Sequence, residues 1–377
     1  MNTAVLPALA IPSNQNHQPV KTSLQKRFFR GLGLVTALAL CTPAFAVLTM
    51  DYVSVGHAGN AANTAVNSPY GAVAHAYQIG KYEVTNTQYT EFLNAVNPTG
   101  FGTDGIGTNG IYSTSMGSDV RGGITFTSDS VDGAKYTIKS NMGDKPVNYV
   151  SWYDGARFTN WMHNGQGSGS TETGAYTLSA SNTEIITKNE GATVYLPSED
   201  EWYKAAYYDP TPGAGGGGNY WLYATQSNNA PTEARANSTG VISNPGANVA
   251  NYGFAPADWN SQNGNVTTVG SAGANNYFGT ADQAGNVSEW NDAVINTTKR
   301  GIRGATWSVI PSDARNYARH SAAPTTESNK MGFRVASVAA SVPVPEPGTF
   351  LPAALLVMGA LLRRRRGLAS RSGRAAA

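Results

Sequence analysis

The chain has 377 residues, a formal net charge of +2 and a single cysteine, Cys41. Ten of its 26 basic residues lie in the two ends, 1–46 and 347–377, which contain no acidic residue, so the section between has 16 basic against 24 acidic residues and a net charge of −8. This acidic section excludes nucleic acid as the expected partner, because phosphates require a basic face, and without a cysteine it has no disulfide, thiolate metal site or cysteine nucleophile.

The first 46 residues have the organisation of a secretory signal peptide. A basic region between residues 21 and 30 precedes an apolar run over 31–40, and Ala44-Phe45-Ala46 has the small-x-small pattern of a cleavage site. We therefore expect signal peptidase to cut after about Ala46. The alternative is an N-terminal membrane anchor, which the short apolar run disfavours because a spanning helix needs roughly 20 apolar residues.

Residues 47–337 are expected to form one large, loop-rich domain. Strands are predicted at 47–55, 77–84, 192–196, 220–223, 300–307 and 331–336. Helices are predicted at about 86–96, at about 152–163 and directly after Ser198, each following a capping box, in which the first and fourth residues cap each other's backbone N–H. The acidic residues 199–201 are assigned to capping alone, since the helix dipole favours them there. The pattern predicts a long surface insertion with short hairpins at 97–145, and mostly irregular chain at 225–275.

The stretch from Asp282 to Trp290 combines two carboxylates, two amides and a glycine before a tryptophan. The carboxylates of Asp282 and Glu289 and the carbonyls of Gly285 and Val287 could converge on one hard cation, and oxygen-only ligands suit Ca²⁺. The alternative is a structural loop in which Asn and Gly form a tight turn and Trp290 packs into the core.

The C-terminal end has three parts in order. A Pro-rich linker, 338–347, ends in Pro345-Glu346-Pro347, and the segment 348–377 carries an apolar run of 13 residues, 350–362, followed by four arginines. This arrangement closely resembles the PEP-CTERM sorting signal of Gram-negative bacteria, in which a membrane protease, exosortase, is thought to cut near Pro-Glu-Pro. The resemblance implies export to the cell envelope, the outer surface or the extracellular matrix. The alternative is an ordinary transmembrane tail anchor, for which the run is short.

Nine short motifs between residues 48 and 337 occur in a distinctive order. They are Lys81-Tyr82-Glu83-Val84-Thr85-Asn86, Pro146-Val147, Ser151-Trp152, Leu196-Pro197-Ser198-Glu199, Glu201-Trp202, Gly285-Asn286-Val287, Glu289-Trp290, Arg303-Gly304 and Gly332-Phe333-Arg334. Each is weak alone, but the ordered set resembles the formylglycine-generating enzyme (sulfatase-modifying factor) domain. The resemblance implies an α+β fold, a loop-rich variant of the C-type lectin fold with small twisted sheets and about three short helices.

The resemblance also implies a calcium ion in the 282–290 loop, held by the four ligands named above. Ser288 replaces the tryptophan that is usual in the family between the small residue and the glutamate. A second calcium site would fall near Asn251 and Tyr252.

The chemistry of the family is copper-dependent oxidation of a substrate cysteine to formylglycine. It needs two cysteines, because soft Cu(I) prefers soft thiolate ligands. Counted back from the Gly-Phe-Arg motif, these positions fall at Pro311 and Asn316, so we expect no copper and none of this chemistry. A related branch holds non-haem iron with several histidines, but the histidines here are scattered without its spacing: His57, His75, His163 and His320.

The leading hypothesis is a non-catalytic member of the family, exported as a binding or structural module. Trp307, Asn316 and Arg319 would lie near the former active site and could bind a peptide or a glycan. The alternatives are an active enzyme, either of the family's own type or a hydrolase using Asp313 with His320, and a matrix component with no specific ligand.

Overall fold

The computed structural model describes residues 47–65, 69–100, 110–178, 186–253 and 257–339. By internal contacts the chain divides into two units, Met1–Ala44 and Phe45–Ala377, and every described residue belongs to the second. The expected signal segment and sorting tail lie outside the described residues. Within those five ranges, no helix has the length and apolar character needed to cross a membrane.

The α-helices of the described residues are short and mostly capped as predicted. They are α1 (Asn86–Val96), α2 (Thr114–Ser118), α3 (Trp152–His163) and α4 (Glu199–Tyr207). Thr85, Ser151 and Ser198 each accept the N–H of the residue three positions on, and that residue's side chain accepts the N–H of the cap. All three predicted capping boxes are therefore confirmed.

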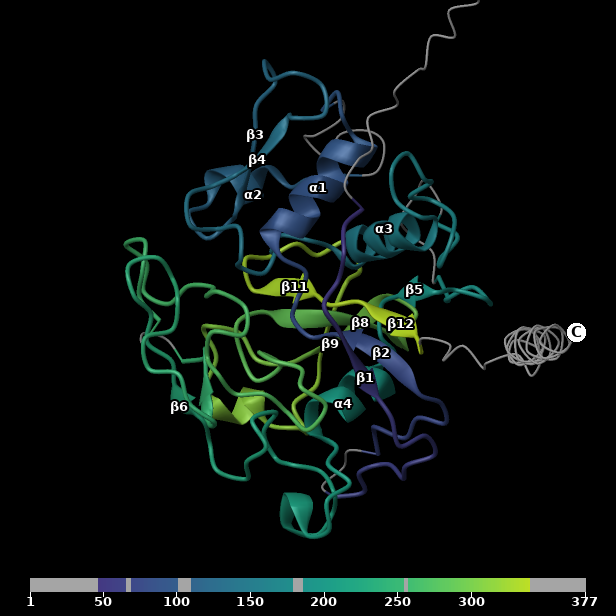
Figure 1. Cartoon of the computed structure of the whole chain (residues 1–377), viewed down its shortest axis with the longest axis vertical. Coiled ribbons are helices and arrows are strands. Elements are labelled where there is room, and N and C mark those ends of the chain that lie inside the picture. Colours follow the sequence, from purple (N-terminus) through teal and green to yellow (C-terminus); the bar gives the residue numbers. More distant parts are fainter. Residues whose placement is uncertain (1–46, 66–68, 101–109, 179–185, 254–256, 340–377) are drawn as a thin grey trace, which may run out of the picture. The chain divides into compact units, whose positions relative to one another are not determined.

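Two four-stranded sheets form the centre of the described unit (Figure 1). The first is antiparallel, in the order β1-β2-β12-β5, with bounds Tyr52–Val55, Tyr77–Gly80, Ala336–Val338 and Val194–Tyr195. The second has the order β10-β9-β8-β11, with bounds His320–Ala322, Lys299–Arg303, Ser288–Asn296 and Met331–Phe333, and β11 lies parallel to β8. Only Arg334 and Val335 separate β11 from β12, so these two residues connect the sheets.

Two small ribbons and two 3₁₀ turns complete the described structure. The ribbons pair β3 (Ile124–Phe126) with β4 (Tyr136–Ile138) and β6 (Thr232–Glu233) with β7 (Val249–Ala250), and the 3₁₀ turns are η1 (Ala214–Gly216) and η2 (Pro311–Ala314). The mixture of few helices and small sheets is the α+β, lectin-like architecture that the resemblance implied.

Aromatic rings hold the helices to the second sheet. Phe92 of α1 lies 5.4 Å, between ring centroids, from Phe158 of α3, and Phe158 lies 5.4 Å from Phe333 of β11. Tyr89 lies 5.3 Å from Phe92. All four rings are fully buried, so this cluster is the main core of the unit.

The prediction of a surface insertion with short hairpins at 97–145 is confirmed for the β3–β4 hairpin and is wrong for the core residues of the segment. The segment contributes five apolar residues to the same core: Ile111, Tyr112, Met116, Ile124 and Tyr136. The five-residue α2 escaped prediction because it is too short to show a helical period. Likewise 220–223, predicted as a strand, forms only isolated bridges, through Tyr220 and Tyr223.

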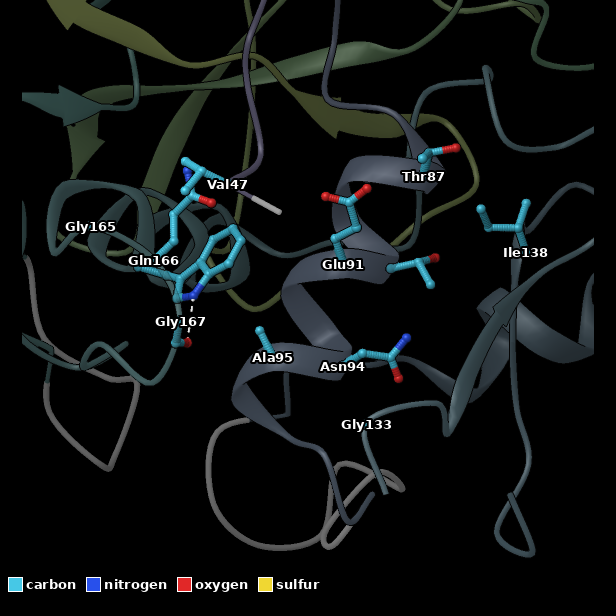
Figure 2. Close-up of a pocket in the computed structure, with 12 residues that line it drawn as sticks. Val47, Thr87, Glu91, Asn94, Ala95, Gly133, Ile138, Gly165, Gln166 and Gly167 are labelled. Carbon is cyan, nitrogen blue, oxygen red and sulfur yellow. Dashed lines mark hydrogen bonds between the residues drawn. The ribbon is translucent and has the colours of Figure 1, made fainter. Parts of the chain in front are cut away.

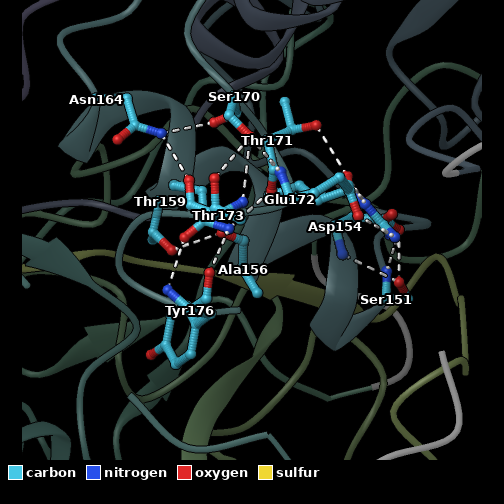
Figure 3. Close-up of polar contacts among 12 residues, drawn as sticks. Ser151, Asp154, Ala156, Thr159, Asn164, Ser170, Thr171, Glu172, Thr173 and Tyr176 are labelled. Atoms are coloured by element: carbon cyan, nitrogen blue, oxygen red, sulfur yellow. Dashed lines mark hydrogen bonds and ion pairs between the residues drawn. The ribbon is translucent and has the colours of Figure 1, made fainter. Parts of the chain in front are cut away.

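The loop after α3 is held by side chains that bind backbone groups (Figure 3). Asn164 Nδ2 donates to the carbonyls of Ser170 and Thr173 at 2.8 and 2.7 Å. Asn160 accepts the N–H of Tyr176 at 2.7 Å and donates to its carbonyl at 3.1 Å. This segment of Gly, Ser and Thr therefore has a defined conformation although it forms no helix or strand of its own.

Candidate functional site

A buried ion pair lies where the two sheets meet. Glu289 of β8 and Arg334 are both fully buried, and Arg334 Nε and Nη2 donate to the two carboxylate oxygens at 2.5 and 2.7 Å. Trp202 Nε1 of α4 donates to the same carboxylate at 2.7 Å. The remaining guanidinium hydrogens bind the carbonyls of Gly80, Lys81 and Ala281. The pair thus connects the second sheet to the end of β2 and to α4.

Two further carboxylates lie near this pair. Glu83 is 1% exposed, and among the described residues neither of its oxygens has a hydrogen-bond partner. Burial raises the pKa of Glu83 well above its ordinary value, and the negative charge of Asp282 adds to the rise. Burial also raises the pKa of Asp282 to about 6, although its carboxylate accepts the N–H of Gly270 at 2.5 Å. This sealed cluster, Glu83, Asp282, Glu289 and Arg334, therefore has three carboxylates and one guanidinium.

The four expected calcium ligands are not equally available. Glu289 is already bound by Arg334 and Trp202, and the guanidinium would repel a divalent ion at that carboxylate. Asp282 lies near the partnerless oxygens of Glu83, which a hard cation would satisfy. In the part of the chain that the structure describes, no three Asp, Glu, His or Cys side chains surround one point as in a complete metal site. Calcium here stays a prediction, with Glu83 and Asp282 the best-placed carboxylates.

The backbone ligands expected at Gly285 and Val287 lie in the turn that leads into β8. Gly285 donates its N–H to the Asp282 carbonyl at 2.8 Å, and a Cβ at Gly285 would lie 2.3 Å from the carbonyl oxygen of Asn251. Only glycine permits this approach. Val287 is fully buried.

Asn251 and Tyr252, the expected second calcium site, pack directly onto this turn. The Asn251 carbonyl accepts the N–H of Asn286 at 2.8 Å, and its Nδ2 donates to Asn286 Oδ1 at 3.2 Å. The Tyr252 hydroxyl donates to the carbonyl of Pro231 at 2.5 Å. The two regions expected to bind calcium therefore adjoin, and at the second the Asn251 amide group already acts as a donor.

A second charged cluster lies at the start of α4. Glu199 Oε1 accepts from Arg303 Nε at 2.7 Å and from Arg319 Nε at 2.8 Å, and Arg319 Nη2 donates to Oε2 at 2.7 Å. Both guanidinium groups lie over the Tyr70 ring, at 4.5 and 5.3 Å from its centroid. The interpretation of Glu199 as a capping residue alone is therefore wrong, because Glu201 completes the capping box.

This open cluster, Glu199, Arg303, Arg319 and Tyr70, has two cations for one carboxylate. Arg319 is 34% exposed, whereas Arg303 is buried, and Arg303 Nη2 has no hydrogen-bond partner among the described residues. Arg303 Nη1 donates to the carbonyl of Asn316 at 3.1 Å, which brings Asn316 to the same place. The accessible Arg319 can therefore offer positive charge and hydrogen-bond donors to a ligand, whereas the buried Arg303 pairs with Glu199.

The two positions that would carry copper ligands in the family hold groups with no affinity for Cu(I). Pro311 begins η2 and is exposed. Asn316 is buried, and its Nδ2 donates to the carbonyl of Trp221 at 2.9 Å. Neither side chain has a sulfur atom or a lone pair suited to a soft metal ion.

Trp307, the third residue expected in the cleft, lies in a different cluster. The Arg121 guanidinium lies 4.5 Å from the centroid of its ring, and its Nε1 donates to the carbonyl of Asn329 at 3.3 Å. It packs with Trp259, Val266 and Val287. The structure thus brings Asn316 and Arg319 together and places Trp307 in a separate set of contacts.

The histidines do not form the centres that the alternatives require. No hydrogen bond or ion pair among the described residues joins Asp313 of η2 to His320 of β10, so the hydrolase alternative lacks its nucleophile–base pair. His75 Nε2 lies 3.0 Å from Glu201 Oε1, and His163 Nδ1 lies 2.7 Å from Thr193 Oγ1.

Sequence reasoning missed Glu83, Arg303, Arg334 and Tyr70 as site residues. Glu83 offered a signal, because it is an acidic residue within the predicted strand 77–84. Arg303 and Arg334 belong to two of the ordered motifs, but their partners are remote in sequence.

Comparisons with known proteins relate the chain to one family and to several solved structures. The family model described as "Sulfatase-modifying factor enzyme 1-like domain" matches residues 46–339. Among solved structures, CarF is 20% identical over 77% of this chain and 99% of its own (TM-score 0.44), and Treponema denticola variable protein 1 is 18% identical over 79% and 100% (TM-score 0.45). PvdO from Pseudomonas aeruginosa is 17% identical over 78% and 93% (TM-score 0.39). A comparison with curated proteins finds no match. Because the family model spans the whole described unit, the chain belongs to the sulfatase-modifying factor enzyme 1-like family.

Proposed function

We propose that this member of the family is an exported, surface-sorted binding module that does not make formylglycine. The observation that carries the proposal is the absence of any cysteine from residue 47 to the end of the chain, with Pro311 and Asn316 in the positions of the copper ligands. Two thiolates cannot be replaced by a pyrrolidine ring and an amide, so the Cu(I) on which the oxidation depends has no ligands.

The ligand that best matches the open cluster is an acidic glycan. Arg319 is partly exposed beside the Tyr70 ring, and Arg315 adds a second accessible guanidinium, hydrogen-bonded to the hydroxyls of Tyr223 and Tyr317. Guanidinium groups bind carboxylates in a bidentate geometry, and the exposed Tyr317 ring beside Arg315 offers an apolar face. An acidic peptide is the alternative ligand.

Export and sorting are proposed from the two ends of the chain. Signal peptidase would remove residues 1–46, and an exosortase-type protease would cut near Pro345-Glu346-Pro347, which places the domain at the envelope or in the extracellular matrix of a Gram-negative bacterium. An acidic polysaccharide of the producing cell would then be close to the open cluster.

The test uses the secreted protein and two assays. Incubated with Cu(I) and a cysteine-containing sulfatase peptide, it should form no aldehyde, and aldehyde formation would overturn the proposal. In the second assay, the acidic exopolysaccharide of the producer should bind, and Arg319→Gln should weaken binding about tenfold, the effect of losing one charge-assisted contact of about 1.4 kcal/mol. Arg235→Gln, at an arginine outside the cluster, is the matched control. If the protein binds an acidic peptide but no glycan, the ligand is a peptide, and the proposal of a binding module still holds.

Calcium is proposed as a structural ion of the sealed cluster. The partnerless oxygens of Glu83 beside Asp282 support it, because an orphaned buried carboxylate is costly without a cation. Elemental analysis of the purified protein, with thermal unfolding in calcium and in a chelator, tests it. We expect calcium to raise the unfolding temperature of the wild type and to have a smaller effect on Glu83→Gln.

A further inference from the structure

A pocket of about 530 Å³ lies against the side of α1 that faces away from the aromatic core. Its floor is a stripe at helical spacing, with Thr87, Thr90, Glu91, Asn94 and Ala95. The loop after α3 supplies Gln166 and Gly167 on one side, and Ile138 of β4 lies on the other (Figure 2).

One charged group in this pocket, the Glu91 carboxylate, has no partner among the described residues. It lies at an exposed position and makes no hydrogen bond or ion pair there, and partial burial raises its pKa. Since no Lys, Arg or His is among the lining residues, this free carboxylate suits an ammonium group.

Val47 is fixed at the same pocket. It is one of the lining residues, and Figure 2 shows it beside Gln166, with Glu91 between Val47 and Thr87 in that view. The Leu48 N–H donates to Gln166 Oε1 at 2.7 Å, and Gln166 Nε2 donates to the Leu48 carbonyl at 2.8 Å. This two-way contact holds the backbone next to Val47 as a paired strand would.

We propose that the pocket receives the α-ammonium group of Val47, with the Glu91 carboxylate as its counter-ion. The group is created when signal peptidase hydrolyses the Ala46–Val47 amide: one water is consumed, the released peptide keeps a carboxylate on Ala46, and Val47 gains the ammonium. The proposal depends on the expected cut after Ala46 and is independent of the ligand of the open cluster.

Cleavage then has a structural consequence. In the uncut chain the nitrogen of Val47 is a neutral amide, which cannot act as a cation for Glu91. In the mature chain a charged terminus is bound where Leu48 is already anchored, so maturation completes the attachment of the N-terminal segment to α1 and to the loop after α3.

The test measures the reactivity of the terminal amine in the exported, mature protein. Mass spectrometry first identifies the terminus, and a terminus other than Val47 overturns the proposal without affecting the function proposed for the open cluster. The rate of α-amine acetylation near pH 7.5 is then compared between the wild type and Glu91→Gln. Because a carboxylate partner favours the unreactive ammonium form, we expect Glu91→Gln to react about threefold faster, the effect of a partly exposed ion pair.

A control variant separates pairing with Glu91 from general charge effects. Asp51→Asn removes an exposed carboxylate four residues from the terminus that does not line the pocket, and its acetylation rate should equal that of the wild type. Equal rates for the wild type and Glu91→Gln, or an equal acceleration by Asp51→Asn, would show that Glu91 is not the counter-ion.

Discussion

The two charged clusters are built from the same kind of contact but differ in charge balance and access. In the sealed cluster, one arginine lies among three carboxylates and is hydrogen-bonded to Glu289; Glu83, Glu289 and Arg334 are buried, and Asp282 is partly buried. In the open cluster, two arginines serve one glutamate and Arg319 reaches the surface. Buried charge of this kind is costly unless it is fully paired. The comparison indicates that the sealed cluster organises the fold, whereas the open cluster is available for binding.

Replacement of one arginine in each cluster should give the largest difference in unfolding free energy between the two clusters. Arg334→Met leaves Glu289 and its neighbouring carboxylates buried without a cation, and should cost about 3–5 kcal/mol of unfolding free energy or prevent folding. Arg319→Met leaves Glu199 paired with Arg303 and should cost less than about 1 kcal/mol, because the lost contact is partly exposed.

Urea unfolding of both variants measures this difference. Where Arg334→Met does not fold, the double variant Arg334→Met with Glu289→Gln should recover soluble protein, because it no longer buries the unpaired Glu289 charge. Equal losses for Arg334→Met and Arg319→Met would contradict the assignment of separate roles.

The sealed cluster should also make stability depend on pH in a defined direction. Burial raises the pKa of Asp282 to about 6, whereas an unfolded aspartate titrates near its ordinary value, so the folded chain binds more protons between about pH 4 and 6. Stability that is present below the unfolded pKa is therefore lost as the pH rises through this window, by on the order of 3 kcal/mol.

Asp282→Asn should reduce this dependence of stability on pH, because asparagine does not titrate. Asparagine also keeps an acceptor for the Gly270 N–H and tolerates the positive φ of 66° at this position. Asp129→Asn, at an exposed aspartate, is the control and should leave this dependence unchanged. Unfolding curves at several pH values, with a chelator present, measure both. If Asp282→Asn leaves the dependence of the unfolding free energy on pH unchanged, another group takes up the proton.

The local parts of this fold could be predicted from the sequence, and the clusters could not. The starts of α1, α3 and α4 are encoded within four residues each, because a capping box joins neighbours in the chain. The partners of Arg334, in contrast, are residues 80, 81, 281 and 289, and no local pattern states that one side chain will reach them all.

In the candidate site, too, features of single positions could be predicted, whereas contacts between remote residues could not. The absence of sulfur at Pro311 and Asn316 is a property of single positions and needs no structure. That Glu199 would bind Arg303 and Arg319 depends on how α4 packs against β9, so the acidic start of a helix was interpreted only as capping. The five core residues between Ile111 and Tyr136 were missed for a related reason: they are spaced too irregularly to show a period.

The smallest expected effect connects local capping with the open cluster. Ser198 caps α4, and the helix begins at Glu199, so Ser198→Ala should cost about 1 kcal/mol of stability and also loosen the position of the glutamate that holds Arg319. Thr85→Ala removes the equivalent cap of α1, which is not part of the open cluster, and should cost a similar amount. Because only the first cap positions the arginine pair, Ser198→Ala should weaken binding of the acidic glycan, whereas Thr85→Ala should leave it unchanged. Equal affinities for the two variants would mean that Arg303 and Tyr70 hold Arg319 in place without help from the helix start.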